Sequence, residues 1–342
     1  RLNTQRGPFI VTGILCALAI VTSGTLMLKH FKAARDCKGA CTVTIRILCM
    51  VPIYSTQAWL ALILRLEYWN KVLEFLRKGY ECIVIIAFAQ LLVGQLGGIR
   101  RLCQNLPEER CCHLPPVRWF VYKLSWTPPE RFVRRTLGGL LQYVPVSLIA
   151  SAFGAVTWIY PPLFWYTQPC CNAVICVSQA IAMYCLIVFY HANQAELAPM
   201  RPVMKLVFIK VMIFFTIWQG IALRTAERLG AFHRLAEQSI HHWTENMVCE
   251  AIGNGLLVLE MFMLSLVHHA VYPPQETAQR AHGSPGLPLD RLPVPGRSQR
   301  FILCQRFVEV FDLSDIRELY RELRLQARTR SSDQLTGPQS DC

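Results

Sequence analysis

An ionisable side chain lies inside the apolar segment KLVFIKVMIFFTIWQG, which runs from Lys205 to Gly220. Lys210 has only apolar neighbours there, and a charge at the centre of a bilayer costs about 2.5–3.5 kcal/mol on insertion scales. Such residues usually face the interior of a helical bundle. Glu260, in the apolar segment 249–271, reaches a similar depth if the two segments are antiparallel neighbours. We therefore expect Lys210 to pair with Glu260, either as structural support or along a path for a solute or ion.

Other polar side chains also lie in apolar segments and are candidates for the same path. Amides inside a membrane most often form hydrogen bonds between helices, each contributing about 0.6–2 kcal/mol. That structural role is therefore the alternative for these positions. The further candidates are Gln219, Asn254, Gln57, Glu81 and Gln90.

The apolar segments identify the class of protein. Of 342 residues, 53% are hydrophobic and only 17% are charged, whereas soluble domains carry about 25% charged residues. Several apolar runs reach the roughly 20 residues that span a bilayer. We expect an all-α, seven-helix transmembrane bundle within residues 1–272. The predicted spans are about 9–28, 44–64, 80–97, 138–160, 170–190, 203–223 and 249–271.

The basic residues predict the orientation of this bundle and its partners. Most lysines and arginines outside the spans fall on one side, in the loops after the first, third and fifth spans and in the C-terminal tail. Arg46 belongs to the first of these loops. Basic loops face the cytosol, so the N-terminus is expected outside or in a lumen and the C-terminus in the cytosol. The net charge of +13 favours anionic lipid as a partner, and no basic, aromatic-rich segment suggests nucleic acid.

The tail divides into three predicted parts. Residues 273–299 are rich in Pro and Gly and are typical of a linker. Residues 300–328 form an arginine-rich amphipathic pattern, which predicts a cytosolic helix lying on the inner leaflet or packed on the bundle. Residues 329–342 are expected to be disordered.

Most of the fifteen cysteines are expected to be buried free thiols, because several lie within apolar runs. No Cys-x-x-Cys pair has a matching second pair or His pair, so neither a metal nor a cofactor is predicted. Cys111 and Cys112 are adjacent in the basic loop after the third span, which is a pattern for S-palmitoylation; a plain loop is the alternative.

Six phrases in a fixed order resemble the family of transmembrane protein 184 and organic solute transporter alpha, called Lazarus-type in plants. The phrases are RILCMVPIYSTQAWLAL (46–62), GYECIVIIAF (79–88), LGGLLQY (137–143), MYCLIVFYHANQAELAP (183–199), RPVMKLVFIKVMIFFTIWQG (201–220) and LEMFMLSLVHHAVY (259–272). The resemblance implies seven transmembrane helices, no enzymatic chemistry, and a plasma, endosomal or vacuolar membrane. It also implies a separate single-span subunit as a partner in the carrier branch; a homo-oligomer is another arrangement we consider.

The chain departs from the family pattern at three positions and keeps it at three others. Gln57 replaces an Asp, Ala87 an Asn and Gln95 a Glu, which weakens any coupling to protons or sodium through those carboxylates. The positions that match are Lys210, Gln219 and Glu260.

Two functions from different classes fit these observations. The first is a carrier that facilitates movement of amphipathic organic anions or of sterol- or lipid-like solutes, with Lys210 suited to an anionic head group. The second is a seven-helix receptor or a signalling or trafficking scaffold without transport. The third span is followed by GGIRRL and the seventh lacks Asn-Pro-x-x-Tyr, which argues against a rhodopsin-like receptor.

Overall fold

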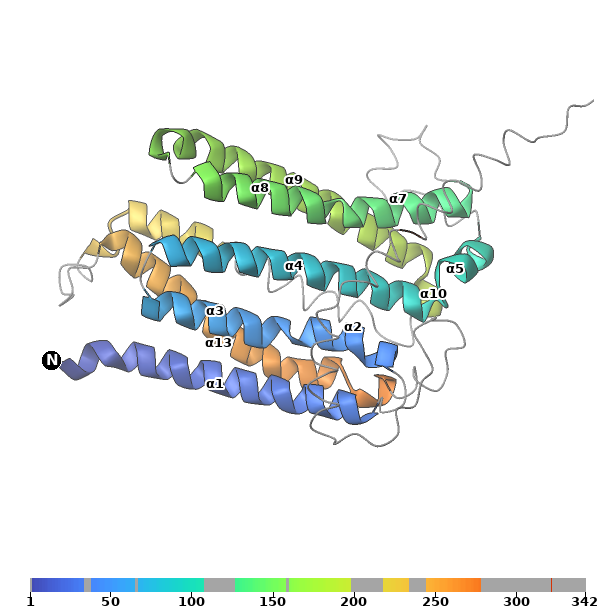
Figure 1. Cartoon of the computed structure of the whole chain (residues 1–342), viewed down its shortest axis with the longest axis horizontal. Coiled ribbons are helices and arrows are strands. Elements are labelled where there is room, and N and C mark those ends of the chain that lie inside the picture. Colours follow the sequence, from blue (N-terminus) through green and yellow to red (C-terminus); the bar gives the residue numbers. More distant parts are fainter. Residues whose placement is uncertain are drawn as a thin grey trace, which may run out of the picture.

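The computed structural model describes residues 2–33, 38–64, 67–107, 127–157, 160–197, 218–233, 244–277 and residue 321. Within these ranges the chain is helical and contains no strand, which confirms the all-α class. Figure 1 shows the helices lying nearly parallel to one another in a bundle. They are α1 (Leu2–Ala33), α2 (Lys38–Leu48), α3 (Met50–Leu64), α4 (Glu67–Gln95), α5 (Ile99–Asn105), α7 (Pro129–Leu141), α8 (Tyr143–Thr157), α9 (Pro161–Ala192), α10 (Gln194–Leu197) and α13 (Glu245–Val271).

Five segments of the described chain are long and apolar enough to cross a membrane, and a bent pair of helices could supply a sixth. The five are Gly7–Ala33, Cys41–Leu64, Pro129–Thr157, Tyr166–Ala192 and Glu245–Val271. The bent pair is α4 and α5. Of the predicted span 203–223, only 218–223 are described, within a helix at 218–228. The seventh span and the orientation in the membrane therefore remain predictions.

The described spans run in two opposite directions. In Figure 1, α1, α4, α9 and α13 run one way, while α2–α3 and α7–α8 return. Helix α3 packs against α1, α13 and α4, and α4 packs against α8; α7 and α8 both pack on α9. The start of α1 and the end of α13 lie at opposite ends of the bundle.

Prolines account for two breaks between consecutive helices. Helix α2 ends at Leu48, four residues before Pro52, and α7 ends at Leu141, four residues before Pro145. Proline has no N–H to donate to the carbonyl four residues earlier, and its ring crowds that carbonyl. Each break therefore occurs where proline removes the helical hydrogen bond, and the helix resumes almost at once.

Glycines account for the sharper break after α4. Gly97 and Gly98 have φ of 78° and 91°, a region that L side chains rarely adopt. The chain turns there, and α4 and α5 differ in direction by 56°. The predicted third span, 80–97, ends at this glycine pair, and α4 begins at Glu67, thirteen residues before the predicted start.

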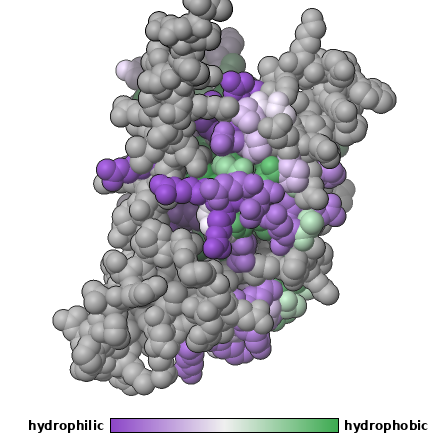
Figure 2. Space-filling model, turned by 90° about the vertical axis from the view of Figure 1, so that its right-hand side faces the viewer, coloured by the Kyte–Doolittle hydropathy of each residue, from purple (hydrophilic) through white to green (hydrophobic). Residues whose placement is uncertain are grey.

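The outer surface separates into apolar sides and a polar end. Large apolar side chains are exposed on α1, α8, α9 and α13, as expected for helices facing lipid. At the end where α5 and α10 lie, hydrophilic residues gather around a small apolar area (Figure 2). Five arginines of α5 and α7 are exposed, namely Arg100, Arg101, Arg131, Arg134 and Arg135. On the apolar sides, the exposed residues of α1, α8, α9 and α13 include Ile10, Ile14, Ile149, Phe153, Val177, Leu259 and Met263.

The start of the predicted linker can be compared with the structure. Residues 274–277 are helical, and Thr277 is buried with its hydroxyl 2.8 Å from His30 Nδ1. The packed structure thus continues past residue 272, into the start of the segment expected to be a linker. Residues 278–299 and the palmitoylation candidates Cys111 and Cys112 lie outside the described residues, as does the predicted helix 300–328 except residue 321.

Candidate functional site

Glu260 lies midway along α13 and accepts a hydrogen bond from Gln219. The donor is Gln219 Nε2, on the helix at 218–228, and the acceptor is Glu260 Oε1. The other carboxylate oxygen, Oε2, is buried and has no hydrogen-bond partner among the described residues. Both residues are only partly exposed. The structure thus brings together two of the predicted site residues, and it leaves one oxygen of a carboxylate inside a candidate membrane span open to a further partner.

The contact fixes the register between the helix at 218–228 and α13. Gln219 contacts Glu260, and a Cβ added to Gly253 would lie 3.3 Å from Leu223 Cδ1. Four residues after Gln219, the partner on α13 is therefore seven residues before Glu260, so the two helices are antiparallel. Lys210 precedes Gln219 by nine residues. In a straight helix it would lie roughly 13–14 Å farther along the axis and about 180° around it.

That register does not favour the Lys210–Glu260 pair, which was expected only because the two residues lie at a similar depth in the membrane. A straight helix would turn Lys210 away from α13, beyond the reach of Glu260. Lys210 itself lies outside the described residues, so its pairing stays a prediction. The described partner of Glu260 is Gln219, another of the predicted path candidates.

Glu81 is a second buried carboxylate, and both of its oxygens have partners. The Tyr143 hydroxyl on α8 donates to Glu81 Oε1 at 3.0 Å. Lys78 Nζ, one turn earlier on α4, lies 3.5 Å from Glu81 Oε2. The Glu81 side chain is 7% exposed and that of Lys78 is 26% exposed. Glu81 therefore joins α4 to α8, which is the structural role considered for these polar residues.

Gln90 has a partner that the sequence did not predict. Arg46 Nη1 donates to Gln90 Oε1 at 3.3 Å, and Arg46 is only 1% exposed. The Tyr80 hydroxyl donates to the Arg46 carbonyl oxygen at 2.6 Å. Assigning Arg46 to a solvated basic loop was wrong, because the residue lies in α2 and packs against α4. Its partners stand 44 and 34 residues away, so no local pattern reveals them.

The remaining candidates, Gln57 and Asn254, lie on α3 and α13, which pack against each other. Gln57 is half-buried on α3, and its Oε1 has no hydrogen-bond partner within the described ranges. Asn254 is half-buried on α13, six residues before Glu260. Trp59, also on α3, packs closely on Gly13 of α1. A Cβ added to Gly13 would lie 3.0 Å from Trp59 Nε1. These positions contribute polar groups to the interior formed by α1, α3 and α13.

The chemistry open to these groups is hydrogen bonding and ion pairing. Carboxylates, amides and a guanidinium can hold polar or charged groups of a solute inside the bundle. In the part of the chain that the structure describes, no three His, Cys, Asp or Glu side chains are placed to hold a metal ion.

Comparison with known proteins covers most of the chain. The family model described as organic solute transporter Ostalpha matches residues 8–277. The chain is 28% identical over 234 residues to a transmembrane protein 184 homolog of Dictyostelium discoideum, covering 65% of this chain and 44% of that protein. It is 24% identical over 290 residues to protein LAZ1 homolog 1 of Arabidopsis thaliana, covering 78% of this chain and 57% of that protein. The chain thus spans about half the length of these curated relatives. No solved structure matches.

Proposed function

Since this chain belongs to the organic solute transporter Ostalpha family, we propose that it facilitates the movement of an amphipathic solute across a membrane. It is a multi-pass integral membrane protein, with apolar helices that span the bilayer. The proposed solutes are organic anions or sterol- or lipid-like molecules, which combine a polar head with an apolar body. Such a solute needs polar partners inside the bundle and an apolar surface beside them.

The observation that supports this proposal is the Gln219–Glu260 contact. A carboxylate at this depth, with one oxygen buried and without a described partner, is destabilising unless it gains a hydrogen bond or a cation. Ionisable residues retained inside membrane spans commonly mark substrate or ion pathways. A hydroxyl group of a sterol-like solute is a suitable donor to Glu260 Oε2. Lys210 remains the proposed contact for an anionic head group.

The experiment measures solute movement in vesicles that contain the full chain. Proteoliposomes are loaded with a panel of sterol sulfates, steroid glucuronides and bile-acid conjugates, and efflux is compared with that of protein-free vesicles. Wild-type protein should release at least one member of the panel. The Glu260→Gln variant should release it about tenfold more slowly, because a charged acceptor is worth about 1.5–3 kcal/mol in a hydrogen bond and 1.4 kcal/mol corresponds to a factor of ten.

Glu250→Gln is the matched control, since it makes the same change ten residues earlier on α13, at an exposed position. Its flux should equal that of the wild type. Normal flux by well-folded Glu260→Gln would remove Glu260 from the path. No flux of any solute by folded wild-type protein would instead favour the receptor or scaffold.

A further inference from the structure

A pocket lined by both polar and apolar side chains lies between α4, α8 and α9 and includes neither Glu260 nor Gln219. Its volume of about 60 Å³ has room for several water molecules, since one needs roughly 10–15 Å³. This is the size of a head group and not of a whole sterol. The polar side chains that line it are Lys71, Glu74, Lys78, Ser151, Gln168 and Asn172.

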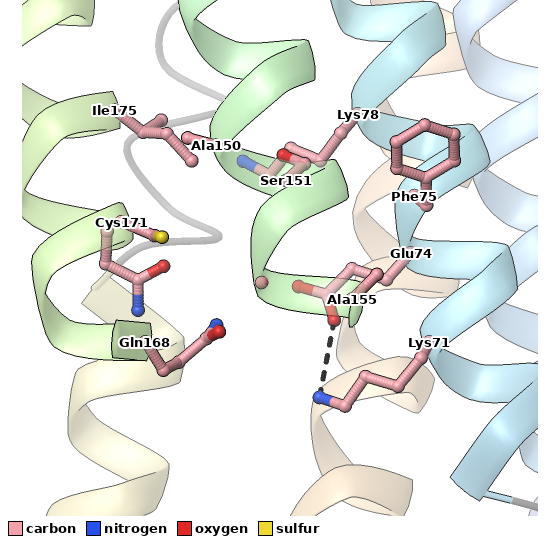
Figure 3. Close-up of a pocket in the computed structure, with 12 residues that line it drawn as sticks. Lys71, Glu74, Phe75, Lys78, Ala150, Ser151, Ala155, Gln168, Cys171 and Ile175 are labelled. Carbon is pink, nitrogen blue, oxygen red and sulfur yellow. Dashed lines mark ion pairs between the residues drawn. The ribbon is translucent and has the colours of Figure 1, made fainter. Parts of the chain in front are cut away.

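Side chains from facing helices converge on this space. Figure 3 shows Lys71 and Glu74 extending from α4 toward Gln168 on α9, with Ser151 and Ala155 of α8 between the two walls. Lys71 Nζ lies 3.7 Å from Glu74 Oε2. The pocket thus combines two ammonium groups, one carboxylate and two amides within a single opening.

Lys78 retains hydrogen-bonding capacity toward the pocket. Its ammonium group carries three N–H donors, and its contact with the Glu81 carboxylate, at 3.5 Å, does not use all of them. The second oxygen of Glu81 already accepts from Tyr143, so this carboxylate is shared between two donors. An oxyanion entering the pocket would therefore find charged donors without breaking the link between α4 and α8.

The absence of a side chain at Gly154 leaves room for the side chain of Gln168. A Cβ at position 154 would lie 3.0 Å from Gln168 Oε1, closer than nearly all real contacts of a Cβ atom. The missing side chain allows the Gln168 amide to lie against α8 at the edge of the opening. Alanine at this position would require the Gln168 amide to shift by a few tenths of an ångström.

The position of the pocket suits an amphipathic molecule. Lys71 is four residues from the start of α4, and Ala155 is two residues from the end of α8, so the pocket opens near one end of the spans. Apolar side chains line the same opening: Phe75 on α4 is 37% exposed, and Ala150 on α8 and Ile175 on α9 lie among the lining residues. A polar head can lie in the pocket while the apolar body follows these helices in the leaflet.

We propose that this pocket binds the phosphate or sulfate head group of an amphipathic molecule in the adjoining leaflet. The ammonium groups of Lys71 and Lys78 contact the oxyanion, and the amides of Gln168 and Asn172 donate further hydrogen bonds. Charge-assisted bonds of this kind are about twice as strong as neutral ones. The site is separate from Glu260, and the inference does not depend on whether the protein transports a solute.

The test is equilibrium binding of labelled ligands to the full chain in phosphatidylcholine nanodiscs. The ligands are dioctanoyl phosphatidic acid, cholesterol sulfate and uncharged dioctanoylglycerol. The wild type should bind an oxyanion ligand at least roughly tenfold more tightly than dioctanoylglycerol. Tighter binding of phosphatidic acid identifies a membrane phospholipid, and tighter binding of cholesterol sulfate identifies a sterol conjugate. Equal binding of the uncharged ligand would overturn the proposal.

Three variants complete the test. Lys71→Gln with Lys78→Gln should weaken oxyanion binding about tenfold, whereas the charge-matched control, Lys29→Gln with Lys32→Gln on exposed positions of α1, should leave it unchanged. Gly154→Ala keeps every charge and should weaken binding roughly threefold by displacing Gln168. If the double lysine variant does not fold, the Gly154→Ala variant tests whether the pocket binds the head group. Binding equal to the wild type in folded Gly154→Ala and in any folded lysine variant would sink the idea.

Discussion

Two groups of helices in this bundle differ in how many of their buried polar atoms have hydrogen-bond partners among the described residues. Helices α1, α3 and α13 pack on one another, as do α7, α8 and α9, and α4 lies between the two groups. In the first group, several buried polar atoms lack a hydrogen-bond partner among the described residues. They are Ser23 Oγ, Tyr54 Oη, Gln57 Oε1, Trp59 Nε1, Glu260 Oε2 and both ring nitrogens of His268. In the second group, the corresponding atoms within the described ranges are the hydroxyls of Ser147 and Ser178.

The difference is clearest at two buried carboxylates, one with described partners on both oxygens and one with a described partner on a single oxygen. At the edge of the second group, Glu81 is fully partnered by Tyr143 and Lys78. In the first, Glu260 has a described partner on one oxygen only. A buried polar group without a partner is costly, so its retention suggests water, an ion or a solute near it. We therefore expect substitutions at Glu81 and Tyr143 to affect mainly folding, and those near Glu260 to affect function.

The largest expected effect is the loss of the Glu81 carboxylate. Glu81→Leu leaves the buried Tyr143 hydroxyl without its acceptor, and that alone costs about 1–3 kcal/mol. Lys78 also loses its carboxylate, but its side chain is 26% exposed and water screens the charge. We expect the free energy of unfolding in mild detergent to fall by about 2–3 kcal/mol. Glu260→Leu should change it by less than about 1 kcal/mol.

The double variant Glu81→Leu with Tyr143→Phe is the control for this prediction. Removing both members of a buried hydrogen bond can be nearly neutral, so the double variant should regain part of the stability lost in Glu81→Leu. If Glu260→Leu is as damaging as Glu81→Leu, the contrast between the two groups is wrong.

A smaller effect is expected from adding one methyl group between α7 and α9. A Cβ at Gly139 would lie 2.4 Å from Cys185 Sγ, so Gly139→Ala forces the helices apart or the thiol to rotate. Overpacking of this kind typically costs about 1–3 kcal/mol, and we expect about 2 kcal/mol from thermal unfolding. Gly138→Ala is the matched control, because no atom lies within 4 Å of its added Cβ. Gly139→Ala combined with Cys185→Ala should recover stability; equal stability of the two single variants would contradict close packing here.

Much of the fold is visible in the sequence because lipid imposes a simple rule of apolar length. The rule underestimates α4, whose first half contains Lys71, Glu74, Lys78 and Glu81. These charges reduce the apolar signal, yet they lie at helical spacing and pair with each other within one turn. A hydropathy average treats each of these charges as unfavourable in a membrane and takes no account of the ion pairs between them.

The contacts of the candidate residues could not be derived from the sequence. Depth along two predicted spans paired Lys210 with Glu260, but depth ignores rotation about the helix axis. The register given by Gln219 and Leu223 places Lys210 half a turn away in a straight helix. Arg46 shows the same limit, since its contact with Gln90 depends on how α2 and α4 pack.

The smallest expected effect is the coupling between Gln219 and Glu260, and it tests the register directly. Hydrogen bonds between membrane helices contribute about 0.6 kcal/mol on average and at most about 1.7 kcal/mol. A double-mutant cycle of Gln219→Leu and Glu260→Gln should therefore give an interaction energy of about 0.6–1.7 kcal/mol in unfolding measurements. The parallel cycle of Lys210→Met and Glu260→Gln should give additive effects, because distant residues do not couple. A coupling of about 3 kcal/mol or more in the second cycle would show a buried ion pair, and it would require the helix to break between Lys210 and Gln219.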